Sequence, residues 1–457
     1  MKIFNTLKKI KEDFKPIKRG EIKMYVCGPT VYDVGHLGHG RAAVVFDVIR
    51  KYFEYKGYKV IFVTNYTDID DKMINRAEEL GISVTELAEK IIPEYKKDFA
   101  ELCVAEPTKQ TRATFYIKQM ISLIRRLDKK GVTYRLDDGI YFDISKFKEY
   151  GKLSGQNLKD LLIGARVEIN ENKKNPQDFV LWKFNKPKEP GWDSPWGNGR
   201  PGWHIECSAM IFSELGESID IHGGGQDLIF PHHECEIAQS ESASGRQFVR
   251  YWMHNGFVNI NKEKMSKSLK NFVTLKDVFN KYPGRVLRFM YLQKHYRAPL
   301  DFSWDLIESA KNGLARIHEF IVRLEKYQPA AHDKNDADIN IDIFLEKFEK
   351  AMDDDFETPM ALAALFDFIN NVNKAMEKGF SVDMKNKVMF VLKRIDDILC
   401  FIFPNEKISD EIIALANERL IERQNKNFDK ADAIRKKIVE KGYEIEDTKD
   451  GYILKRL

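Results

Sequence analysis

Two short motifs that lie far apart in the sequence constrain this chain more than any other feature. HLGH occupies His36–His39, and KMSKS occupies Lys264–Ser268. The run Lys23–Cys27 predicts a short buried strand, and Ala42–Tyr55 carries apolar residues at helical spacing, which places HLGH near the start of a helix. Each motif lies beside a strand-like run, as expected for the opposite halves of one nucleotide-binding fold.

The chemistry of HLGH suits a phosphate group. Unpaired amides and the positive end of the helix dipole attract phosphate, and Gly38 lets a nucleotide base approach the backbone closely. The imidazoles of His36 and His39 lie one turn apart, so both can donate to a single phosphoryl group. Considered alone, such a pair is more often a metal site or a helix cap, and that alternative stays open.

KMSKS, considered alone, is equally typical of a solvated basic loop. In combination with HLGH it predicts that Lys264 and Lys267 neutralise charge on a departing pyrophosphate, while His36 and His39 hold the α-phosphate of ATP. Such preorganised donors are worth roughly 3 kcal/mol each. The other residues of this motif that we expect at the ATP site are Met265, Ser266 and Ser268.

The two motifs resemble the signatures of the class I aminoacyl-tRNA synthetases. The resemblance implies an α/β fold with a doubly wound parallel nucleotide-binding sheet that carries a connective insertion. It further implies that an α-helical bundle and a small mixed α/β C-terminal domain follow the sheet.

A second constellation predicts a metal site. Cys27 follows the first strand, Cys207 lies in WHIECSAM, and His232 and Glu236 lie one turn apart in PHHECEIAQ. Two soft sulfurs, an imidazole and a carboxylate form a suitable four-ligand set for zinc. On helical geometry alone, Cys235 could take the place of Glu236 as the fourth ligand.

A zinc site would solve a problem of selectivity between cysteine and serine. The shape of a pocket separates such near-isosteres by only about a hundredfold, whereas zinc binds a thiolate far better than a protonated hydroxyl. The chain resembles the cysteinyl-tRNA synthetases in particular, and this resemblance implies the ligand set Cys27, Cys207, His232 and Glu236. His233 stays a competing neighbour of His232.

Further residues are expected around the substrates. Three glycines after the strand Ser218–Ile221 allow close approach to adenosine, and Asp227 can accept from the ribose hydroxyls. Thr67 is expected to cap a helix, with Asp70 completing the capping box, although a Mg²⁺ cage is an alternative. Trp203 is expected to close over the small substrate. The residues expected at the ATP and amino-acid sites also include Gly28, Thr30, His222, Gly223, Gly224 and Gly225.

Composition fits a multidomain protein with a large core. The chain has 457 residues, of which 43% are hydrophobic and 32% charged, and its net charge of +4 does not by itself indicate nucleic acid. Five widely spaced cysteines argue against a disulfide framework, and no apolar run reaches the length of a membrane span. We expect a cytoplasmic monomer without a membrane partner.

The organisation along the chain predicts five regions. A helix is expected over Thr111–Lys130, and four helical periods follow Trp304 before Pro404 marks a joint. Two more helices and a hairpin around Asp450 and Gly451 are expected after that joint. The expected regions are a first catalytic half (1–110), a connective insertion (111–200), a second catalytic half with KMSKS (201–304), a helical bundle (305–403) and an anticodon-binding domain (404–457).

The last region carries side chains that suit a single-stranded anticodon. Arg423 can read a guanine edge, Asp432 and Asp447 can accept from exocyclic amines, and Phe428 can stack on a splayed base. The alternative, in which the charged residues only solvate an amphipathic helix pair, stays open.

The resemblance implies that the chain joins ATP and L-cysteine into cysteinyl-adenylate and transfers the cysteinyl group to the 3′ end of tRNA(Cys), with one zinc ion per chain and Mg²⁺ accompanying ATP. Two other functions share some of these features. One is a ligase that attaches cysteine to an amino-sugar, and the other is an RNA-binding regulator without catalysis.

Overall fold

The computed structural model forms two compact units, Met1–Ile402 and Phe403–Leu457. Each is described by itself below. The described residues are 1–156, 172–186, 189–260, 263–264, 272–328, 336, 339–403, 410–425, 427–441, 443–448 and 451–456.

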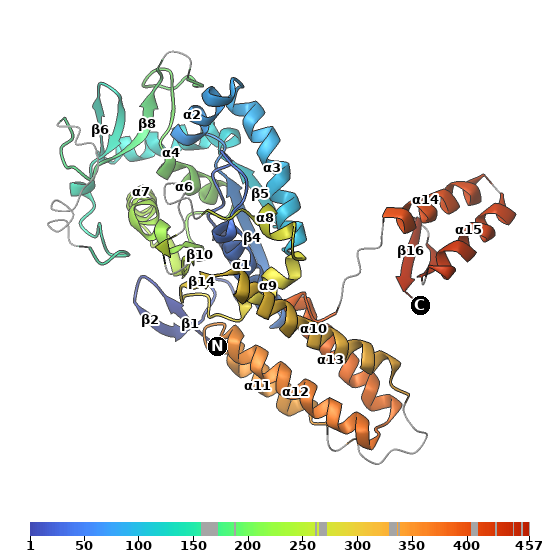
Figure 1. Ribbon diagram of the computed structural model, residues 1–457. Coiled ribbons are helices and arrows are strands. Elements are labelled where there is room, and N and C mark those ends of the chain that lie inside the picture. The colour runs from blue at the N-terminus through green and yellow to red at the C-terminus, as the bar shows by residue number, and fades with distance from the viewer. Residues whose placement is uncertain are drawn as a thin grey trace. The chain divides into compact units, whose positions relative to one another are not determined.

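A five-stranded parallel sheet forms the centre of the first unit (Figure 1). Its spatial order is β11-β10-β3-β4-β5, and each neighbouring pair is parallel. The bounds are β3 Glu21–Val26, β4 Lys59–Tyr66, β5 Lys109–Arg112, β10 Ile219–Gly225 and β11 Val249–Asn255. Because the chain moves outward from β3 first toward β5 and later toward β11, the sheet is doubly wound, as the sequence predicts.

Helices cover both faces of this sheet. On one face lies α1 (Leu37–Tyr55) with α3 (Val84–Glu101) beside it, and Phe46 of α1 packs where a side chain on Gly223 would otherwise stand. The other face carries α4 (Ile117–Lys129), α6 (Trp203–Glu214) and α7 (Glu234–Ser244), which share one apolar core with Tyr25 and Val63 of the sheet. Burial on both faces explains the near-continuous apolar runs of the central strands.

The insertion forms a second, antiparallel sheet in the order β6-β7-β8-β9. Its strands are β6 Thr133–Leu136, β7 Gly139–Phe142, β8 Phe179–Phe184 and β9 Gly199–Pro201. The prediction of one helix over Thr111–Lys130 was wrong at its start. The first residues pair with β4 as strand β5, and a 3₁₀ turn over Ala113–Tyr116 precedes α4, because pairing at the sheet edge outweighs the local helical period.

Smaller elements flank the central sheet. A hairpin at the N-terminus contacts β11, and a three-stranded sheet in the order β13-β12-β14 follows the main sheet. Their bounds are β1 Lys2–Asn5, β2 Ile10–Asp13, β12 Val258–Ile260, β13 Glu263–Lys264, α8 Leu275–Phe279, α9 Gly284–Leu292 and β14 Leu300–Phe302.

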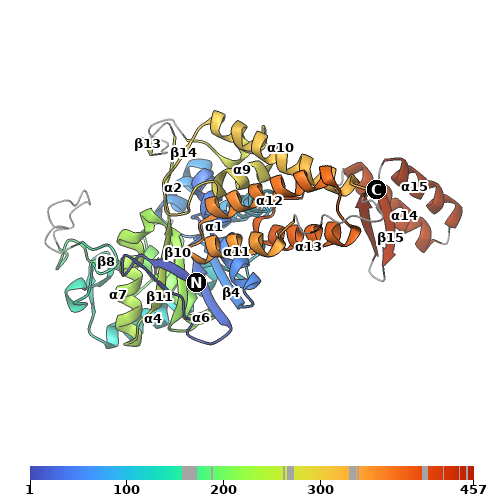
Figure 2. The ribbon, with the colours of Figure 1, turned by 90° about the horizontal axis from the view of Figure 1, so that it is seen from below.

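Four long helices then run alongside one another (Figure 2). They are α10 Trp304–Lys326, α11 Ile341–Asp353, α12 Thr358–Lys378 and α13 Val382–Leu399. Phe344 of α11 stacks on Phe368 of α12 with ring centroids 4.3 Å apart, so large apolar side chains hold the bundle together. None of the helices in the described ranges is long and apolar enough to cross a membrane.

The second unit is a small α/β domain. Two helices pack against an antiparallel hairpin around a core that includes Ala416, Ile434 and Ile445. The bounds are α14 Asp410–Gln424, α15 Phe428–Glu440, β15 Tyr443–Thr448 and β16 Gly451–Arg456.

The start of α2 (Asp71–Leu80) corrects the predicted capping box. Asp70, not Thr67, is the N-cap, and its carboxylate accepts from the Met73 amide at 2.7 Å. Thr67 is buried and turns its hydroxyl to Glu206 instead, at 3.2 Å. The sequence offered two capping residues, and tertiary burial of Thr67 decided between them.

This correction can be tested by amide hydrogen exchange. Removing the cap in Asp70→Ala should weaken the first turn of α2 by about 1 kcal/mol, so its amides should exchange about fivefold faster. Asp70→Asn keeps an acceptor oxygen and serves as the matched control. Equal protection in the Ala variant and in the parent protein would contradict the assignment.

Candidate functional site

The carboxyl ends of β3, β4 and β10 surround a cavity of about 400 Å³. It lies where the strand order reverses on either side of β3, which is the position at which doubly wound sheets bind ligands. The predicted site residues that line it are Cys27, Gly28, Thr30, His36, Gly38, His39, Thr67, Trp203, Cys207, Gly225, Asp227 and His232. One cavity therefore joins the HLGH motif to the proposed metal ligands.

Both histidines of HLGH take part in capping α1. His36 is the N-cap, and its Nδ1 accepts from the Gly38 amide at 3.0 Å, while Nδ1 of His39 accepts from the His36 amide at 3.4 Å. The two rings stack with centroids 3.6 Å apart. The capping alternative is thus realised, but only through one nitrogen of each ring.

This capping decides where the protons lie. A backbone amide can only donate, so Nδ1 of each neutral ring is an acceptor and the ring proton is on Nε2. Burial, together with His36 and Lys72, lowers the pKa of His39 well below its usual value, which keeps that ring neutral. Tyr95 further contacts Nδ1 of His39, at 3.1 Å between its hydroxyl oxygen and the nitrogen. Both rings can therefore present an Nε2–H donor to an anion.

The KMSKS motif begins at the end of a short hairpin. β12 pairs with β13 through Asn259 and Lys264, and the backbone of Lys264 ends β13. The side chain of Lys264 lies outside the described part of the structure, as do Met265, Ser266, Lys267 and Ser268. The segment after the motif is bound to the start of α1, because the Leu275 amide donates to the Gly35 carbonyl at 2.9 Å.

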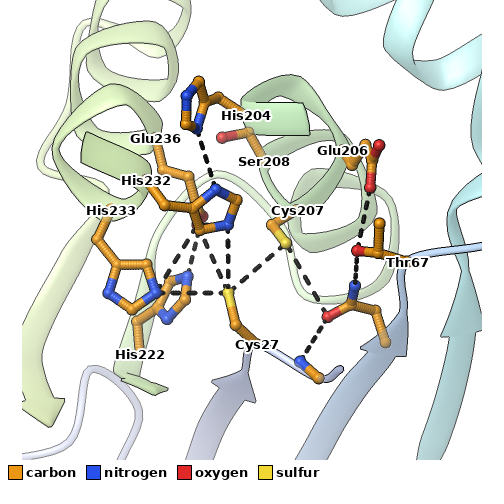
Figure 3. A network of polar contacts seen from close by, with 12 residues as sticks. Cys27, Thr67, His204, Glu206, Cys207, Ser208, His222, His232, His233 and Glu236 are labelled. Atoms are coloured by element: carbon orange, nitrogen blue, oxygen red, sulfur yellow. Dashed lines mark hydrogen bonds and ion pairs between the residues drawn. The ribbon is translucent and has the colours of Figure 1, made fainter. Parts of the chain in front are cut away.

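Four side chains converge at one side of the cavity (Figure 3). Cys27 follows β3, Cys207 lies in α6, His232 lies in the turn before α7, and Glu236 lies in α7. Sγ of Cys27 lies 3.6 Å from Sγ of Cys207, from Nε2 of His232 and from Oε1 of Glu236. Donor atoms about 2.0–2.3 Å from a tetrahedral zinc ion lie about 3.3–3.8 Å from one another. The spacing around Cys27 therefore fits a zinc ion, and its donor types are those that zinc prefers.

A second group shares two of these ligands. Cys27, His222, His233 and Glu236 also have donor atoms within 4.8 Å of one another. Cys207 and His232 line the cavity, whereas His222 and His233 are fully buried and do not. A ligand in the cavity can therefore reach three members of the first group, but only Cys27 of the second.

His222 and His204 each contact one member of the first group. Nε2 of His222 contacts Oε2 of Glu236 at 2.9 Å, and Nδ1 of His204 contacts Nδ1 of His232 at 3.0 Å (Figure 3). Although burial opposes ionisation, His222 and His232 hold the pKa of Glu236 at about 2, so this carboxylate is charged. Contacts of this kind orient ligands in metal sites.

Cys235 is directed away from both groups. Its sulfur contacts the hydroxyl of Tyr150 at 3.4 Å, and burial raises the pKa of this thiol. In contrast, a hydrogen bond from Cys27 lowers the pKa of Cys207 to about 6, which favours a thiolate there. The alternative with Cys235 as the fourth ligand is not supported by the geometry.

Several important side chains were not found from the sequence. Asn65 accepts from the Gly28 amide at 2.9 Å and contacts Thr67, whose hydroxyl reaches the buried Glu206. Burial raises the pKa of Glu206 well above its usual value. Its position next to Cys207 in WHIECSAM was the available signal, since a carboxylate amid apolar residues needs a partner.

The remaining predicted residues have different roles. Trp203 stacks on His232 with ring centroids 4.2 Å apart, and it lines the cavity next to the metal ligands. Asp227 lies in a 3₁₀ turn after β10 and also lines the cavity. Of the three glycines at the end of β10, Gly225 lines the cavity and the other two do not. Gly223 packs on Phe46, and Gly224 lies against Leu228 and His233.

Comparison with known proteins agrees with this geometry. A family model described as the tRNA synthetases class I (C) catalytic domain matches residues 13–312, and one described as the DALR domain matches residues 347–403. The cysteine–tRNA ligase of Caldicellulosiruptor saccharolyticus is 49% identical over 100% of both chains. That of Thermococcus onnurineus is 48% identical over 100% of this chain and 99% of its own length. The chain belongs to the cysteine–tRNA ligase family.

Solved structures of other class I synthetases share the fold of this family member. The methionyl-tRNA synthetase of Mycobacterium tuberculosis, in complex with methionyl-adenylate, has a TM-score of 0.63 at 16% identity and covers 87% of this chain and 94% of its own. The LeuRS of Agrobacterium radiobacter, in a ternary complex with tRNA and LeuAMS, has a TM-score of 0.63 at 12% identity and covers 85% of each chain. The predicted fold class and family are confirmed.

The proposed anticodon residues all belong to the second unit, and two of them are in contact. Arg423 pairs with Oδ2 of Asp447 at 3.0 Å, and the buried Arg419 holds Oδ1 of the same carboxylate at 2.7 Å. Phe428 and Asp432 are exposed on α15. Asp447 is therefore already engaged by two arginines, whereas the ring of Phe428 is available for stacking.

If the first group binds zinc, variants at and around it should differ in their zinc content. The purified protein should contain one zinc ion per chain by elemental analysis, and Cys207→Ser should lose most of it because a thiolate ligand is removed. Cys235→Ser, a matched change at another buried thiol, should retain it. If His233→Gln lost the ion while Cys207→Ser kept it, the second group would be the site.

Proposed function

We propose that this chain condenses L-cysteine with ATP to cysteinyl-adenylate and pyrophosphate, and then transfers the cysteinyl group to the 3′-terminal ribose of tRNA(Cys). One observation carries the proposal. A single cavity joins Cys27, Cys207 and His232 at one side to the HLGH donors at the start of α1 on another.

The side of the cavity that holds the proposed metal ligands selects the amino acid. Cys27, Cys207, His232 and Glu236 would hold zinc there, since their donor spacing and chemistry fit that ion. When bound, zinc supplies a borderline-soft Lewis acid that prefers a thiolate to a hydroxyl, which separates cysteine from serine. Trp203, stacked on His232 at the cavity wall, would close over the small substrate.

The side of the cavity at α1 activates ATP. The Nε2–H donors of His36 and His39 hold the α-phosphate, and the helix dipole of α1 adds to their effect. The cysteine carboxylate attacks this phosphorus, the bond to the bridging oxygen breaks, and pyrophosphate leaves. Mg²⁺ bound with ATP would lower the charge of this leaving group. Lys264 and Lys267 neutralise the charge that develops on the leaving group.

Transfer to tRNA requires recognition of a second substrate. In this step the 3′-terminal ribose hydroxyl attacks the activated carbonyl, and AMP leaves. The second unit would read the anticodon, with Phe428 stacking on a base and Arg423 contacting a base edge. Asp432 lies on the same helix as Phe428 and is exposed, so its carboxylate can accept from the exocyclic amine of a base.

The dual role of His36 gives a sharp kinetic test. An Asn side chain can place an acceptor where Nδ1 lies but cannot replace the Nε2–H donor, so His36→Asn should keep the cap and lose the phosphate contact. Its rate of cysteine-dependent pyrophosphate exchange should fall by roughly a hundredfold, with little change in the cysteine Michaelis constant. A change confined to that constant would assign His36 to amino-acid binding.

The charging assay tests the whole function and separates the two units. The full chain should attach radiolabelled cysteine to tRNA(Cys) transcripts, and a chain ending at Phe403 should still exchange pyrophosphate but charge tRNA poorly, because it lacks the second unit. Cysteine attached to an amino-sugar, with no charged tRNA, would favour the other ligase. Undiminished charging by the short chain would assign the second unit another purpose.

A further inference from the structure

A fully buried arginine lies two residues after HLGH and has no carboxylate partner within the described ranges. Arg41 of α1 is 0% exposed, and its guanidinium donates five hydrogen bonds of 2.6–3.3 Å to backbone carbonyls. The acceptors are the carbonyl oxygens of Gly256, Phe257, His295, Tyr296 and Ala298. Burying a cation among neutral dipoles alone costs free energy, so its position needs a reason.

The carbonyls belong to two backbone segments that support the second half of the nucleotide site. Gly256 and Phe257 line the cavity and lead directly into β12, whose hairpin partner β13 ends at Lys264. The segment around Ala298 lies against Gly256 and continues into β14, which pairs with β12. Arg41 thus joins the HLGH helix to the strands that carry KMSKS.

The opposite flank of KMSKS is bound to the same helix start. The Leu37 amide donates to the Val273 carbonyl at 3.4 Å, and the Leu275 amide donates to the Gly35 carbonyl at 2.9 Å. Both described flanks of KMSKS are therefore bound to the beginning of α1. Backbone hydrogen bonds hold the flank after the motif, and Arg41 holds the flank before it.

We propose that Arg41 is a positioning residue that sets where Gly256, Phe257 and the β12–β13 hairpin lie relative to the HLGH donors. This inference rests on the proposed function, since it assigns both motifs to one reaction. A planar guanidinium can hold the two segments at once because its two terminal nitrogens lie apart in a fixed geometry. Nη1 donates to the Gly256 and Phe257 carbonyls, and Nη2 donates to the carbonyls of the segment that includes Ala298. An ammonium has the same charge but three donors at a single point, so the two segments would shift relative to α1.

The test compares two buried arginines. Arg288 is also 0% exposed and also binds backbone carbonyls, those of Leu399 and Leu102 among them. Unlike Arg41 it pairs with a carboxylate, that of Asp47, and none of these three partners lines the cavity. Arg41→Lys should lower the maximal rate of pyrophosphate exchange by about a hundredfold, the usual cost of a misplacement of about 1 Å. Its cysteine Michaelis constant should change by less than about twofold, because the metal ligands do not contact Arg41. Arg288→Lys should exchange at nearly the parental rate.

A second variant disturbs the same joint without touching the arginine. In Gly256→Ala the added methyl would overlap the Ala298 carbonyl, so the two segments should separate and the same loss of maximal rate should follow. This variant decides the matter if Arg41→Lys does not fold. Equal losses in Arg41→Lys and Arg288→Lys, or parental exchange in Gly256→Ala, would overturn the inference. Absence of exchange in the parent protein would instead refute the proposed function.

Discussion

The parallel pairing of β3 between β10 and β4 is the constraint on which the site depends. All three strands end at the same edge of the sheet, and the chain leaves β3 and β10 toward opposite faces. Cys27, Thr67 and Gly225, which follow or end these strands, therefore meet across one cavity although they are distant in sequence. Any other strand order would separate them.

The proposed metal ligands add a second constraint across the layers. Cys27 comes from the end of β3, Cys207 from α6, His232 from the turn before α7, and Glu236 from α7 itself. A bound ion would link the sheet to both helices, so binding of zinc and packing of this face are coupled. The histidines behind the ligands satisfy polar atoms that would otherwise be costly in a buried layer.

The fold is not specific to one amino acid. Solved synthetases at 12–16% identity have the same architecture, so the sheet and its cavity do not by themselves choose an amino acid. In the proposed function that choice depends on a few side chains at the cavity wall, above all Cys27 and Cys207. In the same proposal the start of α1 supplies the donors for the phosphate of ATP.

Much of this could be predicted from the sequence, because its signals are local. HLGH, KMSKS, the helical periods of the bundle and the donor types of the metal set are each visible within a few residues. The tail hairpin follows from turn chemistry, whereas the doubly wound sheet was implied by the resemblance of HLGH and KMSKS to the class I synthetase motifs. Family resemblance selected Glu236 over Cys235, a choice that helical spacing alone left open.

Tertiary structure decided whatever depends on burial or on the direction of a side chain. Asp70 rather than Thr67 caps α2, since Thr67 is drawn to the buried Glu206. Cys235 is directed toward Tyr150, and the five carbonyls that surround Arg41 come from segments far along the chain. Sequence periodicity reports which residues prefer to be buried, but the partners that satisfy a buried polar group exist only once distant segments have packed together.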